Sequence, residues 1–206
     1  DAYGGELMGH YADQQDAYGG ELMGHYADQV AEQQGYTRAQ QDAYATDSVL
    51  RARAAVESGL FQSEITPVTL KVRGETVEIG QDETPAKCQP DKITRLKPAF
   101  RPDGTVTPAS SASISDGAAA LVLTRASVAQ QRGQQVLARI VAHSTYAADP
   151  GQFATAPVPA IERVLAKAGW QAADVDLFEV NEAFAVVALH AMRELGLPHD
   201  KVNVSG

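Results

Sequence analysis

The chain has only one cysteine, Cys88, in 206 residues, which excludes an internal disulfide and fits a reducing compartment. No apolar run approaches the roughly 20 residues that a membrane-spanning helix needs. The first residues, Asp1-Ala-Tyr-Gly-Gly, lack the basic and apolar pattern of a secretory signal. The sequence also has no His/Cys/Asp cluster at metal-ligand spacing and no Gly-x-Gly-x-x-Gly phrase for a dinucleotide. These absences predict a cytoplasmic protein with no metal site and no membrane span.

Positive charge is also scarce, since the formal net charge is −9 and the Lys and Arg residues form no block. An acidic chain without basic patches argues against binding to nucleic acid or to an anionic membrane surface. The composition is 44% hydrophobic and 21% charged, which is typical of a soluble globular protein. The length fits one good-sized domain or two small ones.

The N-terminus carries a repeat, because residues 1–15 and 16–30 differ only at their last positions, Gln15 and Val30. Structural repeats normally diverge and occur at least three times. We therefore interpret residues 16–30 as the native copy and residues 1–15 as an extra duplicated arm.

Residues 16–103 are predicted to be mainly helical with one hairpin. A helical pattern over 21–34 ends at Gly35, and a Thr37-x-x-Gln40 capping box opens a second helix that ends at Gly59. Alternating β-branched residues predict strands at 65–72 and 76–79, joined at Gly74. Residues 80–103 are polar and proline-rich, which predicts a long loop.

After Gly104 the pattern becomes that of an α/β layer. Continuous apolar runs predict buried strands. The expected strands are 118–124, 136–142, 177–180 and 202–204, and the expected helices are 126–132, 159–168 and 183–195. The domain boundary is placed near residue 104.

The run Asn181-Glu182-Ala183-Phe184 lies where a predicted strand ends and a helix begins. Ligands bind at this edge of open α/β sheets, and a neutral amide there can hold a water or a developing oxyanion. Asn is also a favoured helix N-cap, so the residue types alone leave both roles open.

Several phrases occur in a recognisable order: Met23-Gly24, Leu96-Lys-Pro-Ala-Phe100, Ser113-Ile-Ser-Asp-Gly-Ala-Ala-Ala120, Ala156-Pro-Val-Pro-Ala160, Asn181-Glu-Ala-Phe184 and Val202-Asn-Val-Ser-Gly206. This series resembles the thiolase family, particularly its bacterial acetyl-CoA C-acetyltransferases. The resemblance implies a partial, layered α/β thiolase-like fold. Residues 16–103 would be the helical and hairpin-bearing loop domain that covers coenzyme A, and residues 104–206 the first part of the C-terminal α/β domain.

The resemblance implies condensation of two acetyl-CoA molecules, or thiolytic cleavage of a 3-ketoacyl-CoA, in fatty acid metabolism. Coenzyme A thioesters would be substrates, with no permanently bound cofactor, and the intact protein would be a homodimer or homotetramer. Asn181 would hold the water that stabilises the enolate oxygen.

Six further residues match positions near coenzyme A in the family, namely Met23, Phe100, Ser111, Ser113, Ala183 and Phe184. Phe100 could alternatively anchor its loop to the core, and Ala183 and Phe184 could simply pack a helix on the sheet. Lys87 is interpreted as a solvated surface lysine.

The sequence also departs from the family pattern. Leu22, rather than His, precedes Met23-Gly24, and Ala112 stands where many members have serine, so the acyl-chain preference is open. The family's nucleophilic Val-Cys-x-Ser-Gly phrase, its Gly-His-Pro phrase and its Cys-x-Gly phrase do not occur, and Cys88 matches neither cysteine. We therefore expect the 206-residue chain to be an internal fragment without turnover of its own.

The remaining chemistry-bearing side chains are interpreted as structural. Cys88 is taken as a structural thiol, and His143, His190 and His199 as packing or surface residues.

Three alternatives stay open. The first is a non-catalytic thiolase-like protein that binds acyl-CoA or lipid. The second is a ketoacyl-synthase-type condensing enzyme, which would normally have His at the position of Asn181. The third is an interaction module built on the duplicated arm.

Overall fold

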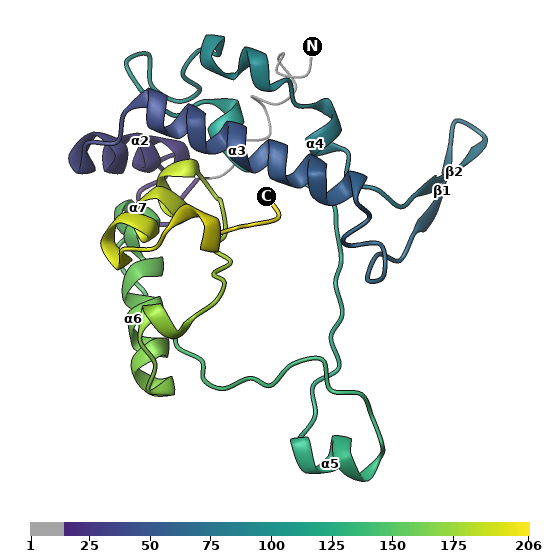
Figure 1. The fold of residues 1–206 in the computed structure, drawn as a ribbon. Helices are drawn as coiled ribbons and strands as arrows, with labels where there is room; N and C mark the ends of the chain where they lie inside the picture. The colour runs from purple at the N-terminus through teal and green to yellow at the C-terminus, as the bar shows by residue number, and fades with distance from the viewer. Residues whose placement is uncertain (1–14) are drawn as a thin grey trace.

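The computed structural model describes residues 15–206, so the predicted arm at residues 1–15 lies outside the described residues except for Gln15. The body is built from four helices: α2 (Met23–Gln34), α3 (Arg38–Glu57), α6 (Pro157–Ala168) and α7 (Ala185–Leu195). A hairpin of β1 (Val68–Val72) and β2 (Glu75–Ile79) projects to one side, and a long excursion carries the short helix α5 (Ala126–Gln131) away from the body (Figure 1). Short elements complete the chain: α4 (Thr84–Lys87) and the 3₁₀ turns Pro90–Arg95, Pro108–Ser110, Pro150–Thr155, Ala172–Asp174 and His199–Lys201.

The local signals that begin and end helices are confirmed. Gly35 follows α2 in the left-handed conformation, with φ of 73°, which a residue without Cβ adopts at little cost. The capping box before α3 is formed in both directions: the Gln40 amide N–H donates to Thr37 Oγ1 at 3.2 Å, and the Thr37 amide N–H donates to Gln40 Oε1 at 2.8 Å. The predicted helix start at Pro159 moves to Pro157, another proline in the first turn.

The hairpin is also confirmed. The turn residues Arg73 and Gly74 both have positive φ, 51° and 88°, as the tightest antiparallel turns require. Val68 pairs with Ile79 and Leu70 pairs with Val77, so the aliphatic side chains share one face of the ribbon. All ten strand residues are exposed, so this face is not covered by the described chain.

The strands predicted at 118–124 and 136–142 are wrong for this chain. Both segments are extended, but neither pairs with another strand among residues 15–206. Leu121, Val122 and Leu137 are 84%, 92% and 88% exposed. A strand can satisfy its backbone hydrogen bonds only through a neighbouring strand, and no described strand pairs with these two.

The segments predicted as strands at 177–180 and 202–204 do pair with each other, but only through a single parallel bridge between Phe178 and Val202. The Phe178 amide donates to the Lys201 carbonyl at 2.8 Å, and the Asn203 amide donates to the Phe178 carbonyl at 2.9 Å. This bridge places the two segments side by side, directly before α7.

The predicted loop at 80–103 instead contains α4 and the Pro90–Arg95 turn. Two arginines of α3 hold it: Arg53 Nε donates to the Pro85 carbonyl and Arg38 Nη2 to the Leu96 carbonyl, each at 2.7 Å. Cys88 is buried within this segment, in keeping with a structural thiol.

The main core lies between α2, α7 and the bridged segments. Ala27, Val106, Val186 and Val202 are fully buried there. No helix within the described part of the chain is long and apolar enough to cross a membrane. The same residues contain no group of three or more His, Cys, Asp or Glu side chains that could hold a metal ion.

Candidate active site

Asn181 lies on the link between the Phe178–Val202 bridge and α7. The alternative interpretation that Asn181 caps this helix is wrong. The helix begins at Ala185, so the N-cap residue is Phe184, whose backbone is extended (φ −147°, ψ 151°) and whose side chain makes no capping bond. Asn181 precedes the cap by three residues and is exposed. Its amide is therefore not used to begin the helix.

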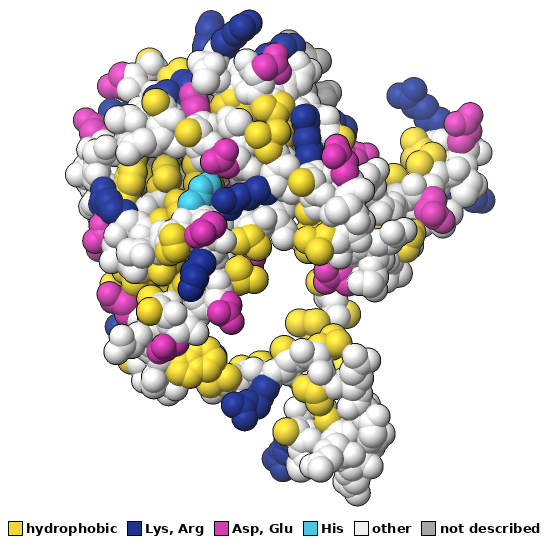
Figure 2. Space-filling view, viewed as in Figure 1, with side chains coloured by type: hydrophobic (Ala, Val, Ile, Leu, Met, Phe, Trp, Pro, Cys, Tyr) yellow, Lys and Arg dark blue, Asp and Glu magenta, His cyan; other side chains and the backbone are white. Residues whose placement is uncertain are grey.

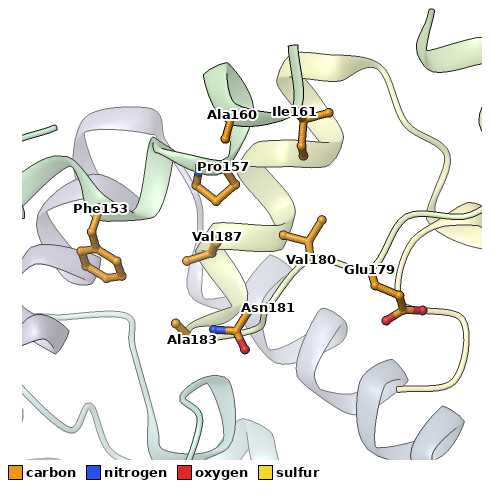
Figure 3. Close-up of a pocket in the computed structure, with 9 residues that line it drawn as sticks. All are labelled: Phe153, Pro157, Ala160, Ile161, Glu179, Val180, Asn181, Ala183 and Val187. Carbon is orange, nitrogen blue, oxygen red and sulfur yellow. The ribbon is translucent and has the colours of Figure 1, made fainter. Parts of the chain in front are cut away.

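Asn181 borders a pocket of about 300 Å³ between α6, α7 and the turn (Figure 3). Most of the wall is apolar, and Asn181 and Glu179 contribute the charged or amide side chains. The lining residues are Phe153, Pro157, Ala160, Ile161, Glu179, Val180, Asn181, Ala183 and Val187. An amide at the edge of an apolar hollow fits the general form of a ligand site.

Three aromatic rings meet beside the turn. Phe184 is 4% exposed and makes edge-to-face contacts with Phe100 and Phe153, at centroid distances of 5.9 Å and 5.8 Å. The Phe100 ring also lies directly on Gly24, where an added Cβ would stand 2.3 Å from ring carbons. Phe100 therefore ties its loop to the core, as one of its two interpretations predicted. Met23, like Phe100, packs against the main core that contains Phe184.

Ser111 joins this group through the backbone. It forms an antiparallel bridge with Phe184, and the next residue, Ala112, donates its amide to the Ala183 carbonyl at 3.0 Å. Ser111 Oγ donates to the Thr107 carbonyl at 2.7 Å. Ser113 lies farther along the outgoing segment, where its hydroxyl contacts Ser115 Oγ at 3.1 Å.

The structure thus brings together Met23, Phe100, Ser111, Ala183 and Phe184, with Asn181 at the edge of the group. Ser113 is not drawn into it by any contact that the structure shows. Lys87 is exposed and paired with Glu83, which agrees with a surface lysine.

Sequence reasoning missed Glu182, which follows Asn181 and turns away from solvent. Its carboxylate accepts hydrogen bonds from Tyr44 Oη at 2.6 Å, Ser48 Oγ at 2.7 Å and Asn203 Nδ2 at 2.7 Å. Burial, together with the nearby Glu182 charge, raises the pKa of Tyr44 above its usual range, so its hydroxyl stays a donor. No motif in the sequence marks residues 44, 48 and 203 as partners.

Asp28 was missed as well. It is 2% exposed, and its Oδ1 accepts the amides of Thr105 at 2.7 Å and Val106 at 2.9 Å. Its Oδ2 is buried with no hydrogen-bond partner, and burial raises the pKa of this carboxyl. Asp28 holds the segment that follows Phe100 against α2.

His25 also supports Phe100. Its Nε2 lies 3.0 Å from the Phe100 carbonyl and its Nδ1 lies 2.9 Å from Glu21 Oε2. His25 therefore acts on the backbone of Phe100, a predicted site residue.

Two other histidines have packing roles. The Tyr36 hydroxyl lies 3.3 Å from His190 Nδ1, and His199 stacks on Tyr44 at 5.2 Å. Burial lowers the pKa of both imidazoles.

Comparison with known families identifies the family to which this chain belongs. The family models for the thiolase N-terminal domain and the thiolase C-terminal domain match residues 3–127 and 134–206. The chain therefore belongs to the thiolase family, and its mixture of helices with a small sheet is a partial thiolase-like α/β fold.

Individual relatives point the same way. A probable acetyl-CoA acetyltransferase of Dictyostelium discoideum is 45% identical over 207 residues, covering 100% of this chain and 46% of the relative. The crystal structure of the Bacillus anthracis acetyl-CoA acetyltransferase superposes with a TM-score of 0.91 at 41% identity, covering 95% of this chain and 50% of that one. An Ascaris suum thiolase in complex with coenzyme A superposes with a TM-score of 0.87 at 34% identity, covering 93% of this chain and 49% of that one. The chain spans about half the length of the relatives it matches.

Proposed function

We propose that the protein of which this chain is part is an acyl-CoA acyltransferase of the thiolase type. It would condense two acetyl-CoA molecules or cleave a 3-ketoacyl-CoA with coenzyme A. The observation that carries the proposal is the placement of Asn181: it lies on the pocket and beside the aromatic cluster, and it does not cap α7. Two of the similar proteins are called acetyl-CoA acetyltransferases, and a third was solved with coenzyme A, which supports this substrate class.

In this proposal Asn181 is the catalytic residue of the described chain. Its amide would hold a water against the enolate oxygen, and a preorganised donor of this kind accounts for about 10²–10³-fold in rate. A neutral amide suits this role, because it donates a hydrogen bond without adding charge to the site.

The predicted coenzyme A residues keep their proposed roles. Phe184 and Ala183 would line the pantetheine channel, and Met23, Phe100, Ser111 and Ser113 would lie near the cofactor portion of the substrate. Edge-to-face packing already fixes the rings of Phe100 and Phe184, so an apolar chain would meet a preformed surface. Coenzyme A thioesters would be substrates, with no permanently bound cofactor.

The remaining assignments follow the same proposal. Residues 16–103 would cover coenzyme A and residues 104–206 would begin the C-terminal domain. We place the protein in the cytoplasm, in fatty acid metabolism, without nucleic-acid or membrane partners. We propose a homodimer or homotetramer, and the exposed aliphatic face of the β1–β2 hairpin supports self-association.

The alternative is a non-catalytic thiolase-like protein that binds acyl-CoA or lipid. The two proposals differ in what the coding sequence around these residues should contain. A Val-Cys-x-Ser-Gly phrase upstream and a Gly-His-Pro phrase downstream would support the enzyme, and their absence would favour the binding protein.

Three measurements test the function. The 206-residue chain should bind coenzyme A in a calorimetric titration, and Phe184→Leu should weaken this binding more than the matched surface change Phe61→Leu. The chain alone should not cleave acetoacetyl-CoA, and detectable CoA-dependent cleavage by it would contradict the expected inactivity. In a gene product that includes both catalytic phrases, Asn181→Ala should lower kcat by about 10²–10³-fold with little change in KM. Equal kcat in the two forms would remove Asn181 from the mechanism.

A further inference from the structure

We propose that Glu182 is a positioning residue for Asn181, and that through it helix α3 sets where the Asn181 amide stands. The proposal rests on the proposed function only in the role given to Asn181. Its structural content, that the turn is held from α3, stands on the contacts of the described chain.

The carboxylate of Glu182 accepts three hydrogen bonds from side chains in distant parts of the sequence. Oε1 accepts from the Tyr44 hydroxyl at 2.6 Å and from Asn203 Nδ2 at 2.7 Å, and Oε2 accepts from the Ser48 hydroxyl at 2.7 Å. Hydrogen bonds to a charged acceptor are short and stronger than those between neutral groups. These bonds hold the residue that follows Asn181.

The residue that precedes Asn181 is held in the same network. Asn203 Oδ1 accepts the Val180 amide at 2.7 Å, and Asn203 Nδ2 donates to the Val180 carbonyl at 2.8 Å. The Asn203 side chain thus replaces a strand partner at the end of the Phe178–Val202 bridge. Its backbone has φ of 47°, a conformation that Asn adopts more readily than most residues with a Cβ.

Asn181 is therefore fixed on both sides while its own side chain borders the pocket. The backbone of Val180 and the side chain of Glu182 share one partner, Asn203 Nδ2. A displacement of Glu182 would remove one of the bonds that fix the Asn203 side chain, which in turn bonds the Val180 backbone. Such coupled polar networks hold a single geometry only when every member is satisfied.

Helix α3 supplies the fixed side of this arrangement. Tyr44, Ser48 and Arg51 recur at intervals of four and three, so they share one helix face. Arg51 Nη1 donates to the Val202 carbonyl at 2.8 Å and the Asn203 carbonyl at 3.1 Å, and its Nη2 donates to the His199 carbonyl at 3.1 Å. Tyr44 additionally stacks on His199 with an interplanar angle of 27°. The helix thus holds the 199–203 segment, whose Asn203 side chain bonds Val180, and holds the turn itself through Glu182.

The three donors around the Glu182 side chain favour a carboxylate at this position but would tolerate an amide. A carboxylate only accepts, so three donors can converge on it without conflict. A glutamine would keep one acceptor for Tyr44 and Asn203, and its NH₂ could donate to Ser48 once that hydroxyl reverses. An alanine would leave all three donors without this partner.

The test compares variants of the 206-residue chain by hydrogen exchange and by NMR of ¹⁵N-labelled asparagine side chains. Glu182→Ala should raise amide exchange in residues 180–184 by about tenfold or more and shift the Asn181 side-chain signals. Ser48→Ala, which removes one donor and is the milder change, should produce a smaller effect in the same residues. Glu182→Gln should restore exchange most of the way to the parent chain.

The matched control is Tyr36→Phe against Tyr44→Phe. Both remove one hydroxyl from a buried tyrosine, but Tyr36 bonds His190 and packs with Arg193 near the other end of α7. Only Tyr44→Phe should change exchange in 180–184 and the Asn181 signals. Equal responses to the two changes, or no response to Ser48→Ala and Tyr44→Phe, would overturn the proposal even if Glu182→Ala fails to fold.

A coenzyme A titration of the same variants separates this inference from the proposed function. If the parent chain does not bind coenzyme A but exchange still rises as expected, the network is upheld and the function fails. If the chain binds coenzyme A but exchange does not respond, the network fails alone.

Discussion

Helix α7 and the segments 118–124 and 136–142 are all apolar, yet they end in opposite environments. In α7, Val186 is fully buried, whereas Val122 is 92% exposed. Figure 2 shows hydrophobic side chains, in yellow, at the surface of the excursion that carries α5. A helix satisfies its own backbone hydrogen bonds and needs only one face covered, and α2 and the bridged segments supply that cover. A strand depends on neighbours for its backbone as well as its side chains. The same kind of sequence therefore forms structure in one region and remains extended in the other.

Where the excursion returns to the body, residues 143–146 contact helix α6. Ser144 Oγ donates to the Ala160 carbonyl at 2.6 Å, Lys167 Nζ donates to the His143 carbonyl at 2.9 Å, and Arg163 lies over the Tyr146 ring. Among the described residues, the contacts of 143–146 with α6 named here are made by polar and charged side chains. The body, in contrast, is held together by a shared apolar core. The comparison predicts that identical substitutions will have very different effects in the two regions.

The largest difference is expected from paired truncations of Phe184 and Leu121. Phe184→Ala removes the central ring of the aromatic cluster and should destabilise the chain by about 3–5 kcal/mol. Leu121→Ala, at a position 84% exposed, should change stability by no more than about 0.5 kcal/mol. Urea unfolding followed by circular dichroism measures both. Similar losses would mean that the excursion is packed in solution and that the contrast between the regions is wrong.

Local chemistry accounts for what the sequence could predict. Helix ends at Gly35 and Gly169, the Thr37–Gln40 box and the Arg73–Gly74 turn depend on residues close in the chain, and each is formed. The strands predicted at 118–124 and 136–142 rest on apolar runs. Such runs indicate that a segment favours burial, but not that a neighbouring strand is present to pair with it. This is why they failed.

The residues of the candidate site likewise fall into those that the sequence could identify and those that it could not. Asn181 could be singled out because its phrase lies at a strand–helix junction and matches a family motif. Glu182, Tyr44, Ser48 and Asn203 could not, since their partnership spans up to 159 residues of sequence. Nothing in a single sequence pairs a glutamate with donors so far away, so supporting networks emerge only from the fold.

The second prediction concerns the contact that holds Phe100 in the body. Gly24→Ala would place a methyl carbon 2.3 Å from Phe100 ring carbons, so the ring must move. Overpacking of this kind costs about 1–3 kcal/mol, and coenzyme A binding should weaken with it. The control is Gly117→Ala in the excursion, where an added Cβ meets nothing within 4 Å. Unchanged binding in Gly24→Ala would separate Phe100 from the ligand site and leave it only as an anchor.

The third prediction uses pH to examine the buried carboxyl of Asp28. Its folded-state pKa lies above the ordinary 3.8, so the folded chain holds the proton more tightly than the unfolded chain. The contribution of Asp28 to the free energy of unfolding is therefore greatest below pH 3.8. It falls as pH rises through the folded-state pKa and stays lower above that pKa. Asp28→Asn should raise stability at pH 7 by about 1 kcal/mol, because it removes a buried charge while its Oδ1 can still accept the amides of Thr105 and Val106. The gain should disappear near pH 3.

Asp103→Asn is the control for this effect, since Asp103 is an exposed carboxylate on the segment that Asp28 holds. Thermal unfolding at pH 7 and at pH 3 measures both variants. A loss of stability in Asp28→Asn at pH 7 would show that the ionised carboxylate, through its bonds to Thr105 and Val106, contributes more than its burial costs.

The smallest effect on stability is expected where the excursion is most exposed, although its effect on association should be clear. Val122→Lys combined with Leu137→Lys places charge on two extended segments that no described strand covers. Stability should change by no more than about 0.5 kcal/mol, because neither side chain is buried. Self-association, followed by light scattering with protein concentration, should fall because unpaired apolar strand edges are where chains pair with one another. The matched change Thr69→Lys with Thr76→Lys, on the polar face of the hairpin, adds the same number of lysines without covering an apolar run. If both pairs of substitutions reduce association equally, the added net charge is the cause. If only the first pair does, the two apolar segments associate as strands that lack a partner within the described chain. The difference between these segments and α7 then lies in whether a neighbouring segment is present to cover them.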